Sequence, residues 1–436
     1  MVLSQRARLV LVVPVCMVLG VVYYGCGGRS SAGDWPHWRG PQGVGVSELG
    51  PLPTAWSGAS ANMRWRSELL GEGNSSPIVS RGRVIVTAAA GARDALERQV
   101  LAYDATSGEL LWTTVVVSAP AEKLHAVNTS ASATPATDGE LVYVNFGSTL
   151  TALDFDGQVV WENEFDPTYF EFSRYGVGSS PLVAGDLVVV AQDRESQRKP
   201  TGWLAAFDKR TGEEVWRTEW DDSCCSYTTP FLVDRSPSEF LFAHSGRLAG
   251  YDIATGEELW HHEYPMLQPV ATPVIDGDLL CASTGGHNKV GTMCIRLEGT
   301  REATQSETLW YTHKLPAKMG SPILFDGTFY VGTVKGILTA YDAETGEIRW
   351  QHRLPRGNYQ GSMVAGDGKL YLWAIEGKTA VVAIDPTEYR ELAANELGED
   401  GTSASPAIGE GCLILRGESH LYCIEAESAA AQATGS

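Results

Sequence analysis

The chain repeats one pattern of apolar and polar positions, in which two short apolar runs flank an Asp and a glycine-containing turn. In the clearest copy, residues 340–350, Ala340-Tyr341 precede Asp342, Thr345-Gly346 form the turn, and the second run ends in Trp350. Further copies end in Trp112, Trp161, Trp216 and Trp260. Two apolar runs separated by a short glycine-containing turn predict a β-hairpin, and the recurrence predicts a repeat fold.

Each residue type in this hairpin has a structural task. The Asp side chain accepts hydrogen bonds from backbone N–H groups two or three residues further on, and Gly reaches positive φ without steric cost. Trp offers the largest apolar plate for burying one sheet against the next. We therefore expect the tryptophans that end these strands to dock neighbouring units rather than to carry chemistry: Trp65, Trp112, Trp161, Trp216, Trp260, Trp310 and Trp350.

A second marker precedes each hairpin: two small residues and a Pro that open an apolar strand. Its copies are Ser75-Ser76-Pro77, Ala133-Thr134-Pro135, Ser179-Ser180-Pro181, Thr228-Thr229-Pro230, Ala271-Thr272-Pro273, Gly320-Ser321-Pro322 and Ala404-Ser405-Pro406, with Gly361-Ser362-Met363 as a degenerate eighth. Another strand, announced by Gly-Asp or Asp-Gly, lies between triplet and hairpin. Units of four strands predict the blades of a β-propeller, and eight triplets predict eight blades.

The two ends of this repeat array complement each other. The last unit ends at residues 421–424 without a fourth strand, whereas residues 62–66 carry a strand and Trp65 without a hairpin before them. Pairing the two completes the last blade and leaves no open edge. The predicted fold is therefore all-β: an eight-bladed β-propeller of four-stranded blades over residues 62–424, closed by an N-terminal strand that completes the last blade.

The Ala-x-Asp-x-x-Thr-Gly-x-x-x-Trp unit resembles the tryptophan-docking repeat of the quinoprotein (PQQ-like) propellers. That superfamily includes quinoprotein alcohol dehydrogenases and the outer-membrane assembly lipoprotein BamB. The resemblance covers residues 62–424 and is specific for the fold, because eight copies agree. The shared motif is a packing motif, so it implies little about function.

The segments outside the propeller predict export. Arg6 and Arg8 precede an apolar run, and Gly25-Cys26 resembles a lipoprotein processing site at which Cys26 would be acylated. Tyr23 departs from that motif, so a signal anchor is the alternative to the signal peptide 1–26. Residues 27–61 are expected to form a tether and a Trp- and Pro-rich lid over one propeller face, or an exposed docking segment. Residues 425–436 are expected to be a disordered tail.

Net charge bears on the class of partner, and cysteine content bears on the cellular compartment. The formal net charge of −20 argues against nucleic acid, whose backbone such a surface repels. Six cysteines lie beyond the leader, an even number suited to an oxidising compartment. Cys281 with Cys294, and Cys412 with Cys423, lie on the middle strands of blades five and eight, as cross-strand disulfides or as buried free thiols. The vicinal pair Cys224-Cys225 is similar to the ring that quinoprotein alcohol dehydrogenases place against their cofactor.

The loops that lead from one blade's outer strand to the next blade's inner strand gather around one mouth of the channel. Their side chains suit recognition, although merely plugging the channel is an alternative. The binding candidates at this mouth are Arg174, Tyr175, Cys224, Cys225, Tyr227, Lys318, Arg356 and Tyr359. No catalytic residue and no metal ligand is predicted.

The sequence thus predicts a non-catalytic, membrane-tethered binding or scaffolding propeller of the cell envelope, on the periplasmic or outer-membrane face. We expect it to be monomeric, without a cofactor, and to bind an envelope protein. The alternative is a quinoprotein oxidoreductase that binds PQQ with calcium in the propeller channel.

Overall fold

The structure is a computed structural model of the chain. It describes residues 33–60, 62–166, 175–194, 201–220, 226–233, 236–244, 246–265, 268–286, 289–299, 304–398 and 400–426. The expectations for the leader and Cys26, for Arg174, for Cys224-Cys225 and for most of the tail fall outside these residues. Within them, no helix is long and apolar enough to cross a membrane.

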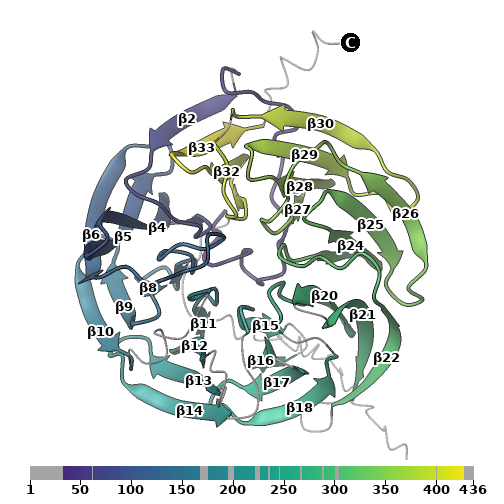
Figure 1. The fold of residues 1–436 in the computed structure, drawn as a ribbon, viewed down its shortest axis with the longest axis horizontal. Helices are drawn as coiled ribbons and strands as arrows, with labels where there is room; N and C mark the ends of the chain where they lie inside the picture. The colour runs from purple at the N-terminus through teal and green to yellow at the C-terminus, as the bar shows by residue number, and fades with distance from the viewer. Residues whose placement is uncertain are drawn as a thin grey trace, which may run out of the picture.

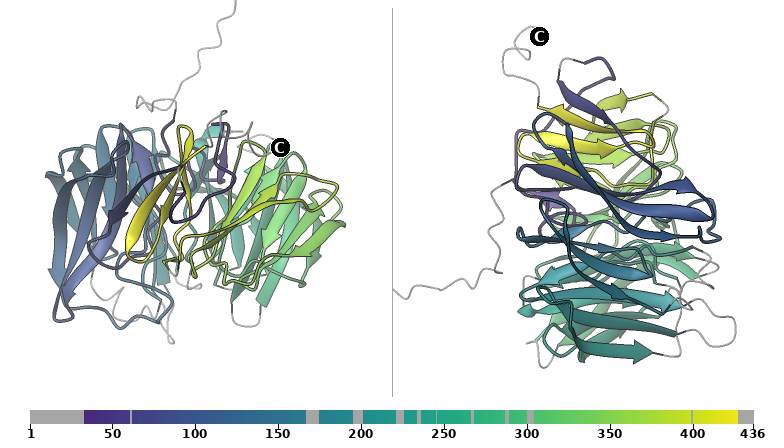
Figure 2. Two further views of the ribbon diagram at one scale, coloured as in Figure 1. Left: turned by 90° about the horizontal axis from the view of Figure 1, so that it is seen from above. Right: turned by 90° about the vertical axis from the view of Figure 1, so that its left-hand side faces the viewer.

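The described strands form eight sheets arranged as a ring, and we call the region around the ring axis the central channel (Figure 1). Figure 2 shows the ring edge-on, with the strands running from one face of the disc to the other. The first strand of each blade lies nearest the channel. Blades 1 to 4 contain β3 (Ile78–Ser80), β4 (Arg83–Ala92), β5 (Ala95–Asp104), β6 (Leu110–Ala119); β7 (Ala136–Thr137), β8 (Leu141–Asn145), β9 (Thr149–Asp154), β10 (Val159–Glu164); β11 (Leu182–Ala184), β12 (Leu187–Arg194), β13 (Thr201–Asp208), β14 (Glu214–Trp220); and β15 (Phe231–Val233), β16 (Ser236–His244), β17 (Arg247–Asp252), β18 (Glu258–Glu263).

The remaining blades follow the same order. Blades 5 to 8 contain β19 (Val274–Asp276), β20 (Leu279–Gly286), β21 (Lys289–Glu298), β22 (Gln305–Thr312); β23 (Ile323–Phe325), β24 (Thr328–Gly332), β25 (Ile337–Asp342), β26 (Ile348–Arg353); β27 (Val364–Gly366), β28 (Lys369–Trp373), β29 (Lys378–Ala383), β30 (Glu391–Glu396); and β31 (Ala407–Gly409), β32 (Cys412–Arg416), β33 (His420–Glu425) with β2 (Met63–Glu68). The predicted eight-bladed propeller is confirmed.

The ring closes as expected. Strand β2 pairs antiparallel with β33, and Trp65 lies opposite Cys423. In Figure 1 the purple N-terminal strand therefore lies beside the yellow C-terminal strands. The prediction that the N-terminal strand supplies the outer strand of the last blade is confirmed, because the sheet order is β2-β33-β32-β31.

A segment before β2, residues 33–60, lies across the inner strands; we call it the strap. Trp35 forms an antiparallel bridge with Val79 of blade 1, and β1 (Val46–Ser47) adds a parallel fifth strand to blade 7 beside β27. Two hydrogen bonds also join the strap to the inner strands. The Asp34 carboxylate of the strap accepts from the Ser80 hydroxyl, and the Leu52 N–H of the strap donates to the Asp367 carboxylate. Ser80 and Asp367 lie at the ends of inner strands that are farthest from the triplets, so this part of the strap lies on the face opposite them.

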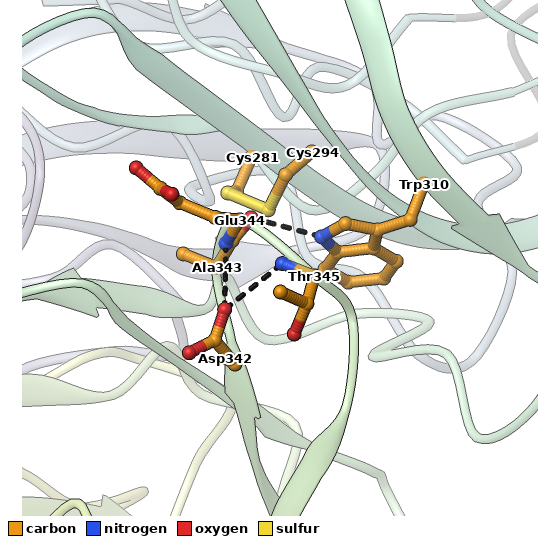
Figure 3. The surroundings of a disulfide bond; sticks show 7 residues. All are labelled: Cys281, Cys294, Trp310, Asp342, Ala343, Glu344 and Thr345. Atoms are coloured by element: carbon orange, nitrogen blue, oxygen red, sulfur yellow. Dashed lines mark hydrogen bonds between the residues drawn. A yellow bond between two sulfur atoms is a disulfide. The ribbon is translucent and has the colours of Figure 1, made fainter.

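Docking tryptophans connect seven of the eight blades to the next at the outer radius, whereas the outer strand of blade 7, β30, contains no Trp. Trp310 Nε1 donates to the Ala343 carbonyl at 2.8 Å, while the Asp342 carboxylate accepts from the N–H groups of Glu344 and Thr345 (Figure 3). Five other tryptophans donate likewise to a carbonyl of the following blade, at 2.8–3.0 Å: Trp65, Trp112, Trp161, Trp216 and Trp350.

Trp260 departs from this arrangement. Its Nε1 donates at 2.5 Å to the carboxylate of Glu239 in its own blade. Each accepting carbonyl of the other blades belongs to a turn Asp or to the residue after it, whereas blade 5 has no Asp between Cys294 and Trp310. Trp260 still packs with the apolar residues of blade 5, so it remains an inter-blade packing residue with a different hydrogen-bond partner.

The two cysteine pairs differ because their strand registers differ. Cys281 lies directly opposite Cys294 on β20 and β21, and the two form a disulfide (Figure 3). Cys412 faces Glu425 and Cys423 faces Ile414, which makes the two cysteines diagonal neighbours. Both are buried free thiols, so the disulfide interpretation of this pair gives way to the alternative of free thiols.

Candidate functional site at the central channel

A closed ring of hydrogen bonds surrounds the channel at the level of the triplets. In each blade, the backbone N–H of the second triplet residue donates to the hydroxyl of the second triplet residue in the next blade. The eight N···O distances lie between 2.9 and 3.1 Å. We call this set the hydroxyl ring: Ser76, Thr134, Ser180, Thr229, Thr272, Ser321, Ser362 and Ser405.

The hydroxyl ring explains why every triplet has Ser or Thr at its second position. All eight side chains are at most 7 % exposed, and a buried backbone N–H needs an acceptor. Blade 7 has Met363 in place of the triplet Pro, yet Ser362 stays in the ring. The hydroxyl at this position is thus kept where the Pro is lost.

At the mouth on the triplet side, the loops of blades 2, 3 and 4 bring several aromatic rings together. The Tyr175 ring centroid lies 5.1 Å from that of His125 and 6.0 Å from that of Tyr227. The Asn128 amide donates to the Tyr175 carbonyl, and the Tyr227 N–H donates to the Pro269 carbonyl. Tyr175 and Tyr227, two of the candidates from the sequence, therefore share one cluster.

The other described candidates lie in separate connections. Lys318 and Arg356 are exposed, in the loops between blades 5 and 6 and between blades 6 and 7. Tyr359 is only 4 % exposed, and its hydroxyl donates to the Pro355 carbonyl at 2.9 Å. Burial raises the pKa of Tyr359 well above its ordinary value. We therefore assign Tyr359 to packing rather than to a binding surface, because its ring is buried against Gly336.

Sequence reasoning missed Asp193, at the end of β12 on the same side. Its carboxylate accepts hydrogen bonds from Trp220 Nε1 at 3.1 Å and from the Ser226 N–H. Burial raises the pKa of Asp193 to about 7. Gly202 lies opposite both Asp193 and Trp220, and a Cβ there would collide with Asp193 Oδ1. The signal that could have identified Asp193 is Gly202, a glycine that lies between the larger Asp193 and Trp220 on the two neighbouring strands.

The position of Asp193 matters because Trp220 and Ser226 flank residues 221–225, which include the vicinal cysteines. Trp220 also stacks on His244, with ring centroids 4.9 Å apart. A carboxyl group that titrates near neutral pH is suited to proton transfer. Among the residues that the structure describes, no group of three or more His, Cys, Asp or Glu side chains gathers as a metal site.

Comparison with known families now adds to this geometry. The model of the PQQ_2 family, described as "Outer membrane protein assembly factor BamB", matches residues 42–175, 169–352 and 301–392. The chain belongs to this family. The resemblance to PQQ-like propellers is thereby confirmed, and the matches extend around most of the ring. No curated protein matches the chain.

Solved structures of similar fold include both dehydrogenases and BamB. A europium-containing methanol dehydrogenase superposes with a TM-score of 0.63 at 12% identity, covering 89% of this chain and 90% of that one. The quinohemoprotein alcohol dehydrogenase from Comamonas testosteroni gives 0.63 at 13% identity, covering 90% and 80%. BamB from Moraxella catarrhalis gives 0.48 at 19% identity, covering 70% and 82%, a score too low to add to the argument. At these identities the likeness shows the fold alone.

Proposed function

We propose that the protein is a non-catalytic binding or scaffolding propeller of the cell envelope. The observation that carries the proposal is the match to the family model whose description is the outer membrane protein assembly factor BamB. Its matches run from residue 42 to residue 392. The architecture supports it, because the hydroxyl ring and the docking tryptophans link adjacent blades at two radii. Such a frame holds loop residues in fixed positions, which lowers the entropic cost of binding.

The proposed partner surface is the mouth on the triplet side. It carries the aromatic cluster of His125, Tyr175 and Tyr227 together with the exposed cations Lys318 and Arg356. Aromatic and Arg side chains dominate the energetics of protein interfaces. The partner we propose is an envelope protein, reached by a propeller that is exported and held at the membrane by a lipid on Cys26 or by an uncleaved signal anchor.

Site-specific photocrosslinking tests this surface in cells that express the full chain. A photoreactive amino acid at Lys318 or at Arg356 should yield one discrete adduct, containing the same envelope protein from both positions. Glu344 is the matched control, because it is also exposed but lies in a docking hairpin on the opposite face. The proposal fails if the mouth positions give no discrete adduct, or if Glu344 gives the same one.

The second candidate is a quinoprotein oxidoreductase that uses PQQ with calcium, and Asp193 is the observation that favours it. A carboxyl with a pKa near 7 that accepts hydrogen bonds from Trp220 and Ser226 is the kind of group that an oxidoreductase uses as a base. Under the scaffold proposal, calorimetry with calcium and micromolar PQQ should detect no binding. Saturable binding that is lost in Asp193→Asn and in the double variant Cys224→Ala/Cys225→Ala would favour the enzyme instead.

A further inference from the structure

Arg39, in the strap, is a buried cation with unused hydrogen-bond donors. Its side chain is 1 % exposed, and its Nη2 donates to the Pro322 carbonyl at 2.5 Å. Its Nε and Nη1 atoms are buried and have no hydrogen-bond partner among the described residues. Burial lowers the pKa of Arg39 to about 9 and is the only cause of that shift, so no charged neighbour in the described part compensates the guanidinium.

The position of Arg39 places this cation within the channel. The strap contacts the far ends of the inner strands, whereas Pro322 directly follows Ser321 of the hydroxyl ring. The Arg39 side chain therefore reaches from the strap to the triplet level of blade 6. On one side the guanidinium is packed against the strap itself, since a Cβ on Gly45 would lie 2.6 Å from Nη2.

A second buried arginine, Arg416, bonds to a triplet residue beside the ring. Arg416 Nη1 donates to the carbonyl and hydroxyl of Ser75, the residue before Ser76, and to the Thr87 carbonyl. Its Nε and Nη2 are also buried without a hydrogen-bond partner in the described part. By contrast, the buried Arg98 pairs with the Glu122 carboxylate at 2.5 Å. Arg39 and Arg416 therefore both have buried nitrogens without a hydrogen-bond partner among the described residues, but they contact different blades.

The hydroxyl ring adds donors and no charge. Each ring hydroxyl accepts one backbone N–H, and none of the eight donates to a described protein group. A hydroxyl has one proton to donate, and a buried cation without a counter-charge costs several kcal/mol. The triplet level of the channel thus has an excess of positive charge and of donors, within a chain whose net charge is −20.

We propose that the central channel binds a small oxyanion, a carboxylate or a phosphate, with Arg39 as its principal ligand. The anion accepts from the unused guanidinium nitrogens of Arg39 and from hydroxyls of the ring, and supplies the missing negative charge. A metal cation would meet like charge and donors at this position. The strap is therefore part of a binding site as well as a cover, and this site is separate from the proposed partner surface at the mouth.

Thermal unfolding of the purified protein tests this proposal. Chloride is replaced stepwise by acetate or by phosphate at constant ionic strength, so that general screening of the acidic surface stays fixed. A ligand that binds only the folded state raises the melting temperature with saturating dependence on concentration. We expect a saturating rise of the melting temperature with acetate, with phosphate or with both. A rise with acetate indicates that the site binds a carboxylate, and a rise with phosphate indicates that it binds a phosphate. Arg39→Met should abolish the rise, whereas Arg81→Met, at an exposed turn of blade 1, should retain it.

A second measurement remains decisive if Arg39→Met does not fold. Crystals of the wild-type protein soaked in selenate, an oxyanion with an anomalous signal, should show selenium within hydrogen-bond distance of Arg39 Nε or Nη1. Selenium at surface positions only would refute the site. The proposal is also wrong if neither anion raises the melting temperature, or if the rise persists in Arg39→Met.

Discussion

The role of the glycine in the docking turn can be tested by a Gly-to-Ala substitution, which adds one methyl group. Gly346 has φ +73°, and a Cβ there would lie 2.6 Å from Cγ and Cδ2 of Trp310, the docking tryptophan of the preceding blade. Gly327, in the same blade, has φ +64°, and a Cβ at that position would meet no atom within 4 Å. Comparing the two variants separates backbone strain from the contact with the tryptophan. Ala is strained by the positive φ at both positions, but it collides with Trp310 only at position 346.

The magnitudes follow from these contacts. A non-glycine residue at positive φ costs about 1–2 kcal/mol, and this is the whole expectation for Gly327→Ala. Gly346→Ala must also displace the Trp310 ring, and forced repacking of a well-packed site costs about 1–3 kcal/mol. Displacement further weakens the bond from Trp310 Nε1 to the Ala343 carbonyl, a contribution of about 1 kcal/mol. We therefore expect a loss of about 3–6 kcal/mol for Gly346→Ala.

Urea unfolding of both variants measures the difference, with the midpoint compared if the transition is not two-state. A double-mutant cycle sharpens the test: in a Trp310→Ala background, Gly346→Ala should cost about as much as Gly327→Ala, since the ring is gone. Equal losses for the two glycine variants in the wild-type background would refute the idea that the turn glycine exists to receive the neighbouring tryptophan.

Three further predictions concern pH, thiols and docking. The Asp193 carboxyl has a pKa of about 7 in the folded protein, against an ordinary value of 3.8. As the pH rises, the unfolded chain loses this proton first, so the free energy of unfolding should fall from about pH 4 to pH 7. Thermal melts across this range should show a weaker pH dependence for Asp193→Asn. Reduction of the Cys281–Cys294 bridge, which closes a short loop, should lower the free energy of unfolding by about 3 kcal/mol in denaturant titrations. Trp350→Ala should cost about 3–5 kcal/mol and His261→Ala, at a partly exposed strand position, little; equal effects would exclude a docked Trp350.

The fold was predictable because its defining contacts recur in most of the units. A hairpin turn and a strand-opening triplet are local patterns, and their repetition specifies the number of blades without knowledge of distant contacts. The unpaired ends, Trp65 without a hairpin and residues 421–424 without an outer strand, then left one way to close the ring. The repeat did not predict the exception, since Trp260 was expected to dock like the others but donates to Glu239 of its own blade.

The site was less predictable because its contacts depend on depth and register. Tyr359 follows a strand in a loop, as Tyr175 does, but the sequence does not state that its ring turns inward against Gly336. Asp193 becomes notable only when Gly202 and Trp220 lie beside it on two other strands. The hydroxyl ring is the opposite case: all eight Ser and Thr residues are visible in the sequence, but there the triplet indicates only small residues that open a strand.

The division between a repeated frame and variable loops can be tested within one connection. Ser321 accepts the Thr272 N–H at 2.9 Å, so Ser321→Ala leaves a buried backbone donor without its acceptor and should cost about 1–3 kcal/mol. Lys318, three residues earlier, is exposed, and Lys318→Ala should change stability by no more than about 0.5 kcal/mol. If the mouth is the partner surface, Lys318→Ala should nevertheless weaken partner capture, whereas Ser321→Ala should leave it intact at temperatures where the variant is folded. Loss of stability from Lys318→Ala comparable to that from Ser321→Ala would show that frame and binding surface are not separable here.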